Sequence, residues 1–236
     1  MDKLERQRGM YELTGASMPQ RSALAVLAGL VVLFAWWFVA GSGLGTLAVA
    51  IHHAARSGDP QRRLWLAVAF TVYYVRILFT EFVFLRRGVS WNEVFMIAAW
   101  LLIIVLILGS AAGMNSAPLG ASAWVAVGLF LFGSWMNSWA EFTRHRWKLR
   151  QENRGLLYTG GLFRYSRHPN YLGDVISFSG LCLFSGRWFT IVVPLLMLVG
   201  FVFVNIPMLD AHLHDHYGAA FDDYAAHTRK LIPFLY

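Results

Sequence analysis

Hydrophobic positions along this chain come in long continuous blocks, separated by short polar stretches. A helix needs about 20 mostly apolar residues to cross a bilayer, and most of the blocks reach that length. Turn residues such as Gly58-Asp59-Pro60 separate them. The blocks cover residues 22–51, 64–85, 91–112, 119–140, 171–185 and 188–208. The pattern predicts an all-α, polytopic integral membrane protein with about six transmembrane helices, forming one domain over residues 1–236.

The basic residues are distributed unevenly between the two ends of these helices. The net charge is +7, from 20 Lys and Arg against 13 Asp and Glu. With six crossings and a cytoplasmic N-terminal arm over residues 1–21, 15 Lys and Arg lie on the cytoplasmic side and 4 on the other. This asymmetry follows the positive-inside rule and predicts cytoplasmic termini. The cations are interleaved with apolar blocks, which argues against nucleic acid as a partner, and the Ala/Gly/Arg-rich composition favours a bacterial inner membrane.

The second block contains polar residues at membrane depth. Tyr73, Arg76 and Thr80 are spaced to share one face of a helix, and Glu81 lies beside Thr80. Charged groups inside a membrane are costly and need a partner or a function. One interpretation is a polar stripe that lines a cavity, with Tyr73 as a proton donor. The other is structural, with Arg76 and Glu81 neutralising each other or neighbouring helices.

The fourth block ends in a second polar face. Asn137, Glu141 and Lys148 are separated by four and seven residues, which places them on one side of a helix. An amide and a carboxylate can bind a ribose hydroxyl or an adenine amine, and a nearby cation can bind phosphate. The alternative is a solvated helix end with basic residues at the membrane interface.

Residues 160–174 form the densest polar segment of the chain. Pro169 disfavours helix at His168, and Gly160-Gly161 permits unusual backbone shapes, so we expect a shaped connection that leads into a helix. Irregular polar backbone at membrane depth is tolerated where it lines a cavity or is buried in protein. This indicates a ligand site; the alternative is a simple interfacial loop. Its polar side chains are Arg164, Tyr165, Arg167, His168, Asn170, Tyr171 and Asp174.

The tail over residues 210–236 is predicted to begin as an amphipathic helix and to end in an extended segment. Its histidines suggest a metal, but His212, His214 and His216 point in different directions from a helix, and the chain lacks an HExxH pattern. The single cysteine, Cys182, excludes an intrachain disulfide and a thiolate zinc cluster. We therefore expect no metal site.

Two motifs resemble those of a known family. The first runs Leu-Tyr-Thr-Gly-Gly-Leu-Phe-Arg-Tyr-Ser-Arg-His-Pro-Asn-Tyr-Leu-Gly-Asp174. The second is the tail, Tyr217-x3-Phe-Asp-Asp-Tyr224 followed by Arg229-Lys-Leu-Ile-Pro-Phe234. Together they are similar to the steroid 5-alpha-reductase superfamily, in a bacterial branch. The Arg-His-Pro-Asn-Tyr-Leu-Gly-Asp run is also similar to the sterol C14 and C7 reductases and the lamin B receptor. The resemblance extends over residues 64–236.

The resemblance implies an NADPH-dependent reductase of an activated C=C bond in a hydrophobic, steroid-like or other lipid substrate. It implies a cytoplasm-facing cofactor pocket over residues 137–174 and 210–236. Tyr73 matches the catalytic tyrosine that polarises the substrate carbonyl. Glu81 is the candidate to replace a catalytic glutamate that the family places on an early helix. The candidate NADPH-binding residues are Arg87, Asn137, Glu141, Lys148, Arg164, Tyr165, Arg167, His168, Asn170, Tyr171, Asp174, Asp210, Tyr217 and Tyr224.

Two other functions stay open. Isoprenylcysteine and phospholipid methyltransferases carry a similar Arg-His-Pro-x-Tyr-Leu-Gly segment, bind S-adenosylmethionine there, and are more distantly similar to this chain. They usually have a Glu-Glu pair where this chain has Asp210-Ala211, and Asn170 follows the proline here; both features favour the reductase. The third function is a lipid-binding membrane protein without activity, which would not need an intact cofactor pocket.

Overall fold

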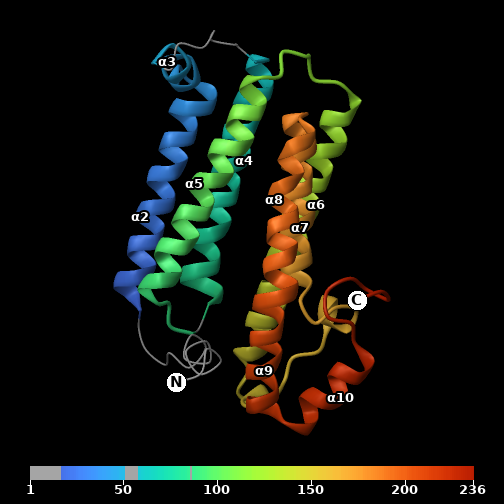
Figure 1. Ribbon diagram of the computed structural model, residues 1–236. Coiled ribbons are helices and arrows are strands. Elements are labelled where there is room, and N and C mark those ends of the chain that lie inside the picture. The colour runs from blue at the N-terminus through green and yellow to red at the C-terminus, as the bar shows by residue number, and fades with distance from the viewer. Residues whose placement is uncertain (1–16, 51–57, 86) are drawn as a thin grey trace.

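The computed structural model describes residues 17–50, 58–85 and 87–236, and in these ranges the chain is helical with no strand. Most of the predicted N-terminal arm lies outside the described residues. The long helices run side by side along one axis (Figure 1). The prediction of an all-α membrane protein is confirmed.

The first half of the chain forms four long helices with one short helix between them. Asp59 caps one of them by accepting a hydrogen bond from the Arg62 amide at 2.7 Å, and Pro60 occupies its first position. Ser90 caps another by accepting from the Glu93 amide at 3.2 Å. The elements are α2 (Met18–Ala35) with the π-helical turn η1 (Trp36–Ala40), α3 (Gly43–Ala50), α4 (Pro60–Phe79) with η2 (Thr80–Phe84), α5 (Trp91–Gly113) and α6 (Ala121–Lys148).

In the second half, α7 begins at Pro169, so residues 169–174 are helical and belong to the helix and not to the predicted connection; Gly186, whose φ of 69° is left-handed, caps its end. The helix that follows is longer than the hydrophobic block, because it continues without a break into the polar tail. The elements are η3 (Gln151–Asn153), η4 (Gly161–Arg164), α7 (Pro169–Ser185), η5 (Trp188–Ile191), α8 (Val192–Gly200), η6 (Phe201–Asn205), α9 (Ile206–Tyr217) and α10 (Ala219–His227).

Four of the helical stretches in the described residues are long and apolar enough to cross a membrane. They are Met18–Ala40, Pro60–Phe84, Trp91–Gly113 and Trp188–Tyr217. The other two predicted spans correspond to α6, whose lower end is charged, and α7, which has 17 residues. Both lie alongside the four (Figure 1), so six crossings stay a prediction.

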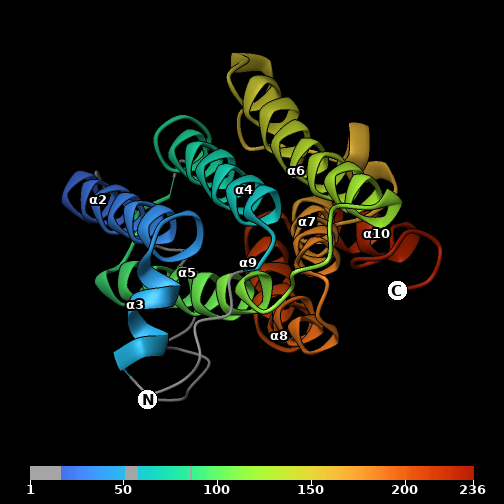
Figure 2. The same ribbon diagram turned by 90° about the horizontal axis from the view of Figure 1, so that it is seen from above.

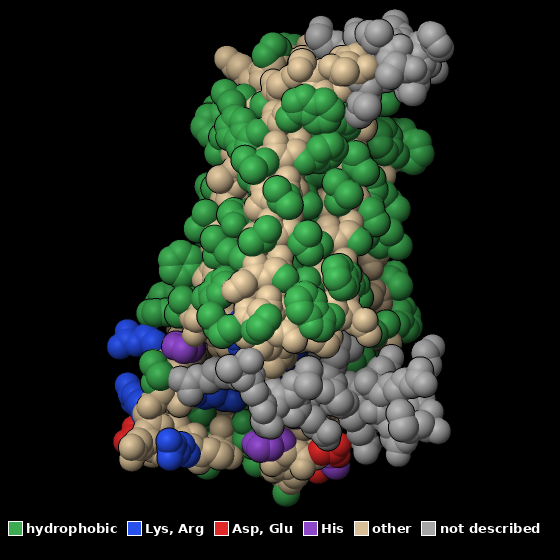
Figure 3. Space-filling model, turned by 90° about the vertical axis from the view of Figure 1, so that its left-hand side faces the viewer, with side chains coloured by type: hydrophobic (Ala, Val, Ile, Leu, Met, Phe, Trp, Pro, Cys, Tyr) green, Lys and Arg blue, Asp and Glu red, His purple; other side chains and the backbone are tan. Residues whose placement is uncertain are grey.

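Seen along the helix axes, α7 occupies the middle of the bundle (Figure 2). It contacts α4, α5, α6 and α8, while α2 packs on α4 and α5. The buried core includes Phe70, Ile104, Leu108 and Phe178. Apolar side chains cover most of the visible face, and Lys, Arg, acidic and His side chains gather at its lower end (Figure 3).

Glycines bring α6 and α7 unusually close together. A Cβ on Gly173 would lie 2.7 Å from the Gly133 carbonyl oxygen and 2.8 Å from the Asn137 amide nitrogen. A Cβ on Gly133 would lie 2.5 Å from the Ser177 amide nitrogen. Backbone cannot move away as a flexible side chain can, so these glycines set the distance between the two helices.

Gly133→Ala is therefore expected to lower the free energy of unfolding by about 1–3 kcal/mol, because the added methyl group overpacks the α6–α7 contact. Gly128→Ala is the matched control on the same helix, since a Cβ there has no atom within 4 Å. This control is expected to leave stability unchanged or to raise it by about 1 kcal/mol. Chemical unfolding in detergent micelles measures both. Equal effects of the two substitutions would contradict the close packing.

The tail differs from the prediction in its last residues. Instead of an extended segment, residues 231–236 form a turn in which the amides of Leu231 and Ile232 both donate to the Tyr236 carbonyl, each at 2.7 Å. Leu231 is buried. The prediction of an extended segment was wrong. The apolar Leu231 side chain is buried in the protein, and the chain folds back after it.

Candidate functional site

A network of polar side chains joins α6 to the start of α7. The Asn137 side chain donates to the Asn170 carbonyl at 3.0 Å, and the Asn170 amide donates to Glu141 Oε1 at 3.0 Å. Asn137 and Glu141 are buried, which excludes the solvated helix end as their role. Asn170 reaches them because it lies in the first turn of α7, one turn from Gly173, where the two helices are closest.

Arg144 completes this network, although the sequence analysis did not select it. It donates to Glu141 Oε2 at 2.6 Å. Its charge also interacts with Tyr171 and Tyr217. Arg144 is three residues after Glu141 and seven after Asn137, so the helical spacing that selected those two would also have selected it. The network thus contains a cation beside its carboxylate.

A second buried pair connects α4 to α7. Arg76 forms an ion pair and a hydrogen bond with Asp174, and their side chains are 10% and 16% exposed. Of the two structural alternatives, the pairing of Arg76 with Glu81 is wrong, and the neutralisation of Arg76 by a neighbouring helix is confirmed. Within the described part of the chain, Nη1 of Arg76 is buried without a hydrogen-bond partner. Thr80 bonds the carbonyl of its own helix, as Ser and Thr often do.

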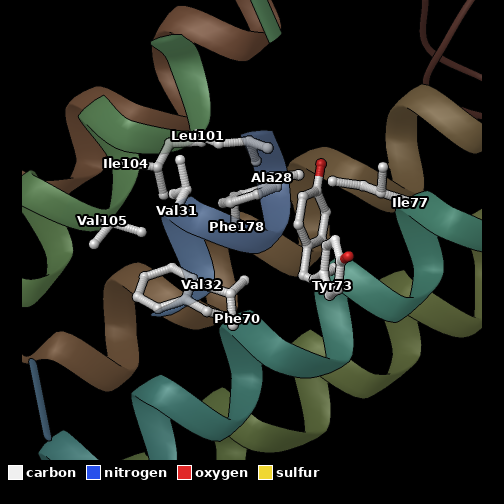
Figure 4. A pocket seen from close by; sticks show the side chains of 11 residues that line it. Ala28, Val31, Val32, Phe70, Tyr73, Ile77, Leu101, Ile104, Val105 and Phe178 are labelled. Carbon is white, nitrogen blue, oxygen red and sulfur yellow. The ribbon is translucent and has the colours of Figure 1, made fainter. Parts of the chain in front are cut away.

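Tyr73 lies between this pair and an apolar region of the core. The Arg76 guanidinium is 4.4 Å from the centre of the Tyr73 ring, and the ring packs edge-on against Phe178 with centroids 5.0 Å apart. Tyr73 lines an apolar cavity of about 20 Å³ among α2, α4, α5 and α7 (Figure 4). A cavity of this size holds about one water molecule. One face of Tyr73 thus meets apolar space and the other meets a cation.

Glu81 and Arg87, two further predicted residues, belong to a separate polar group. Arg87 contacts both carboxylate oxygens of Glu93 at the start of α5. Glu81 interacts electrostatically with Glu93, Arg21 and Arg87, and its Oε2 is buried without a hydrogen-bond partner in the described residues. The contacts that the structure gives Glu81 are therefore with this group, and its pairing with Tyr73 stays a prediction.

Three predicted cofactor residues hold the tail against the 160–174 segment. Arg167 donates to Asp210 at 2.6 Å and to the carbonyls of Ala225 and Thr228 at 3.1 and 2.9 Å. His168 Nε2 is 2.9 Å from the other Asp210 oxygen. All three side chains are buried or nearly so, and these polar contacts lie within the protein. Arg167, His168 and Asp210 therefore act on the site by fixing the tail.

The aromatic residues of the tail make related contacts. The Tyr224 hydroxyl donates to the Phe163 carbonyl at 2.6 Å, and burial raises the pKa of Tyr224, which keeps this phenol a donor. Tyr171 stacks between His168 and Phe201, with centroids 5.3 and 4.5 Å apart. The Tyr224 bond joins the tail to the connection, and the Tyr171 stack joins the start of α7 to η6.

At the lower end of α6, Lys148 Nζ lies 3.4 Å from the Tyr217 hydroxyl on α9 and 6.0 Å from the centre of its ring. Tyr217 also interacts with Arg144. The two predicted residues are therefore together beside the network, and the tail contributes Tyr217 to its edge.

Arg164 and Tyr165 are exposed, unlike the other polar side chains selected in this segment. Arg164 lines an open groove of about 640 Å³ between the end of α6, the connection before α7 and α10. Trp147, Asp223 and His227 also line it. No group of three or more His, Cys, Asp or Glu is arranged to hold a metal in the part of the chain that the structure describes.

Comparison with known proteins gives one short match and one long match. Over 68 residues, or 28% of this chain, the sequence is 41% identical to "Probable O-methyltransferase ustE" of Ustilaginoidea virens. That alignment covers 24% of the relative, so the chain matches about a quarter of its length. The model of the family described as "Protein of unknown function (DUF1295)" matches residues 86–228, which is more than half of the chain. The protein therefore belongs to the DUF1295 family, within the steroid 5-alpha-reductase superfamily.

Proposed function

We propose that this protein is an NADPH-dependent reductase of an activated C=C bond in a hydrophobic, steroid-like or other lipid substrate. The observation that carries the proposal is the position of Tyr73, which borders an apolar cavity and lies against Arg76. A phenol at such a boundary can donate a hydrogen bond to the carbonyl of a bilayer-dissolved enone. In its described state the cavity is smaller than a lipid, so substrate entry requires α2, α4, α5 and α7 to separate locally.

The residues below Tyr73 fit the cofactor. NADPH carries several phosphate charges, and the cations Arg76, Arg144 and Lys148 lie on α4 and α6 around the polar network. Nη1 of Arg76, which is buried and has no hydrogen-bond partner among the described residues, is a donor that a ligand can satisfy. We assign the contacts with a ribose hydroxyl or the adenine amine of NADPH to Asn170 and Glu141. We assign the contacts with its phosphates to Arg144 and Lys148.

When bound, NADPH supplies the hydride. The protein's own contribution begins at the substrate carbonyl, where negative charge develops as the hydride is added. The Tyr73 hydroxyl stabilises that charge by donating a hydrogen bond, and the Arg76 cation over its ring strengthens the donor. Asp174 holds Arg76 in place. The apolar residues around Tyr73 exclude water, which strengthens these electrostatic interactions.

The second candidate is an S-adenosylmethionine-dependent membrane methyltransferase, which the 68-residue similarity to a probable O-methyltransferase favours. The local charges argue for the reductase. The methyl donor carries a cationic sulfonium group, whereas the three cations Arg76, Arg144 and Lys148 outnumber the two carboxylates that pair with them, Asp174 and Glu141, and leave a net positive charge that favours an anionic cofactor. Asp210, at the position where such methyltransferases usually have an acidic pair, has its carboxylate engaged by Arg167 and His168.

Thermal unfolding of the purified protein with NADPH or S-adenosylmethionine separates the two candidates, because a ligand that binds only the native state raises its stability. At about 100 times the dissociation constant, NADPH is expected to add about 2.7 kcal/mol, or roughly 5–10 °C in Tm. Stabilisation by S-adenosylmethionine alone would overturn the reductase. Stabilisation by neither would favour the lipid-binding protein without activity.

Asn170→Ala tests where the cofactor binds. This substitution removes the amide that Glu141 Oε1 accepts from, so the NADPH-dependent shift in Tm is expected to disappear. Asn115→Ala is the matched control, since the Asn115 amide donates to the Ser185 carbonyl at the other end of the bundle, at 3.1 Å. The control is expected to lower Tm without ligand and to keep the full shift. An unchanged shift in Asn170→Ala would place the cofactor elsewhere.

A further inference from the structure

The turn over residues 229–236 exposes large apolar side chains outside the candidate membrane spans. Phe234 is 81% exposed and Leu235 is 78% exposed, although both belong to a folded segment. Exposed apolar side chains that cluster on a fixed element indicate a surface that binds something apolar. The same turn contains two charged residues, Arg229 and Lys230, and both are also exposed.

The backbone holds these side chains in position. The Leu231 and Ile232 amides both donate to the Tyr236 carbonyl, and Leu231 is fully buried beneath the turn. Phe234 has a φ of 67°, in the left-handed region that bulky residues avoid. The turn thus holds Phe234 in an unfavourable backbone conformation, with its side chain exposed. Such a conformation persists where the surrounding structure enforces it.

The turn also lies at the right height along the bundle. In Figure 1 the C-terminal end is level with the lower ends of α2, α4 and α5, whereas α10 lies below it. Figure 3 shows apolar side chains giving way to charged ones toward that lower end of the bundle. The turn is therefore placed at the height along the bundle where the bilayer core would meet the headgroups.

We propose that the 229–236 turn is an interfacial anchor that binds the anionic phospholipids of the leaflet beside it. Phe234 and Leu235 insert at the boundary between headgroups and acyl chains, and Arg229 and Lys230 contact the phosphates. Apolar side chains next to cations are the chemistry by which segments lie in the interface of anionic membranes.

The anchor is connected to the candidate site through the backbone. The Arg167 amide donates to the Arg229 carbonyl at 2.8 Å, and the His168 amide donates to the Lys230 carbonyl at 3.1 Å. Arg167 and His168 also bind Asp210 of the tail. An anchor bound to the leaflet would therefore fix, through these two hydrogen bonds, the connection that positions Asn170. This inference does not depend on which cofactor the network binds.

Site-directed fluorescence tests the anchor in the full chain. The native cysteine is removed as Cys182→Ala, and an environment-sensitive fluorophore is attached to Leu235→Cys. Asp223→Cys is the matched control on α10, because the Asp223 side chain is 83% exposed and charged. The proteins are reconstituted in phosphatidylcholine vesicles with and without phosphatidylglycerol.

The label at position 235 is expected to be quenched by lipids that carry a nitroxide near the headgroup and to resist aqueous iodide. The label at position 223 is expected to show the reverse. Iodide quenching of both labels alike would overturn the anchor, and so would protection of position 235 from both quenchers, which would mean that protein covers it.

Charge substitutions test the lipid class. Phosphatidylglycerol is expected to increase lipid quenching at position 235, and Arg229→Gln with Lys230→Gln is expected to abolish that increase, because each cation near an anionic surface contributes to binding. Equal quenching in both vesicle types before substitution would overturn the assignment to anionic phospholipid.

Discussion

Removing one partner of the Arg76–Asp174 pair is expected to lower the free energy of unfolding by about 3–5 kcal/mol, because the other partner is left as an uncompensated buried charge. The pair joins α4 to the central helix α7, and both side chains are largely buried. Arg76→Met and Asp174→Leu keep similar volumes while removing one charge each. Denaturant unfolding in detergent micelles, with the wild type in parallel, measures the loss.

The double substitution Arg76→Met with Asp174→Leu distinguishes the cost of an unpaired buried charge from the cost of lost packing between the two side chains. It is expected to recover most of the lost stability, since a packed apolar pair often replaces a buried ion pair at little cost. The exposed pair Arg150–Glu152 provides the control, and Glu152→Gln there is expected to change stability by less than about 1 kcal/mol. Additive losses in the double variant would contradict a direct pairing of Arg76 with Asp174.

The helices and their polar faces could be predicted from the sequence because both depend on local spacing. Pro169 starts α7, and Asn137 and Glu141 share a buried face, as their separation implies. The partner of Arg76 could not be predicted in this way. Glu81 is near in sequence, but Asp174 reaches Arg76 because α7 packs against α4. Which helices meet depends on packing between distant segments, and periodicity within one helix contains no such information.

The same limit explains the other differences. The family resemblance implied that Arg167, His168 and Asp210 bind the cofactor. In the structure they bind one another across the connection and the tail, which only the folded chain brings together. Glu81 was selected to fill a catalytic role, but its helical face turns toward Arg21 and Glu93. The sequence thus predicted which residues gather in the polar region, whereas the contacts between them depend on the folded chain.

The proposed reduction takes place at Tyr73, at the boundary between the polar region and the apolar cavity. Tyr73→Phe is expected to lower kcat by about 10²–10³, the cost of removing one hydrogen-bond donor to a developing oxyanion. Cofactor binding is expected to be unchanged, since the Arg76–Asp174 pair and the α6–α7 network do not require the Tyr73 hydroxyl. NADPH oxidation with lipid enones such as a 3-keto-4-ene steroid measures turnover, and the NADPH-dependent shift in Tm measures binding.

Tyr74→Phe makes this test specific, because Tyr74 lines the same cavity but its hydroxyl donates to the Ala25 carbonyl at 3.2 Å on α2. Loss of that bond is expected to cost about 1 kcal/mol of stability and less than about tenfold in turnover. The two variants remove the same atom from neighbouring positions, so a difference between them reports the role of the hydroxyl and not general damage to the cavity. Full activity of Tyr73→Phe would show that another group polarises the substrate. The Nη1 of Arg76, buried and without a hydrogen-bond partner in the described chain, would then be the next donor to test.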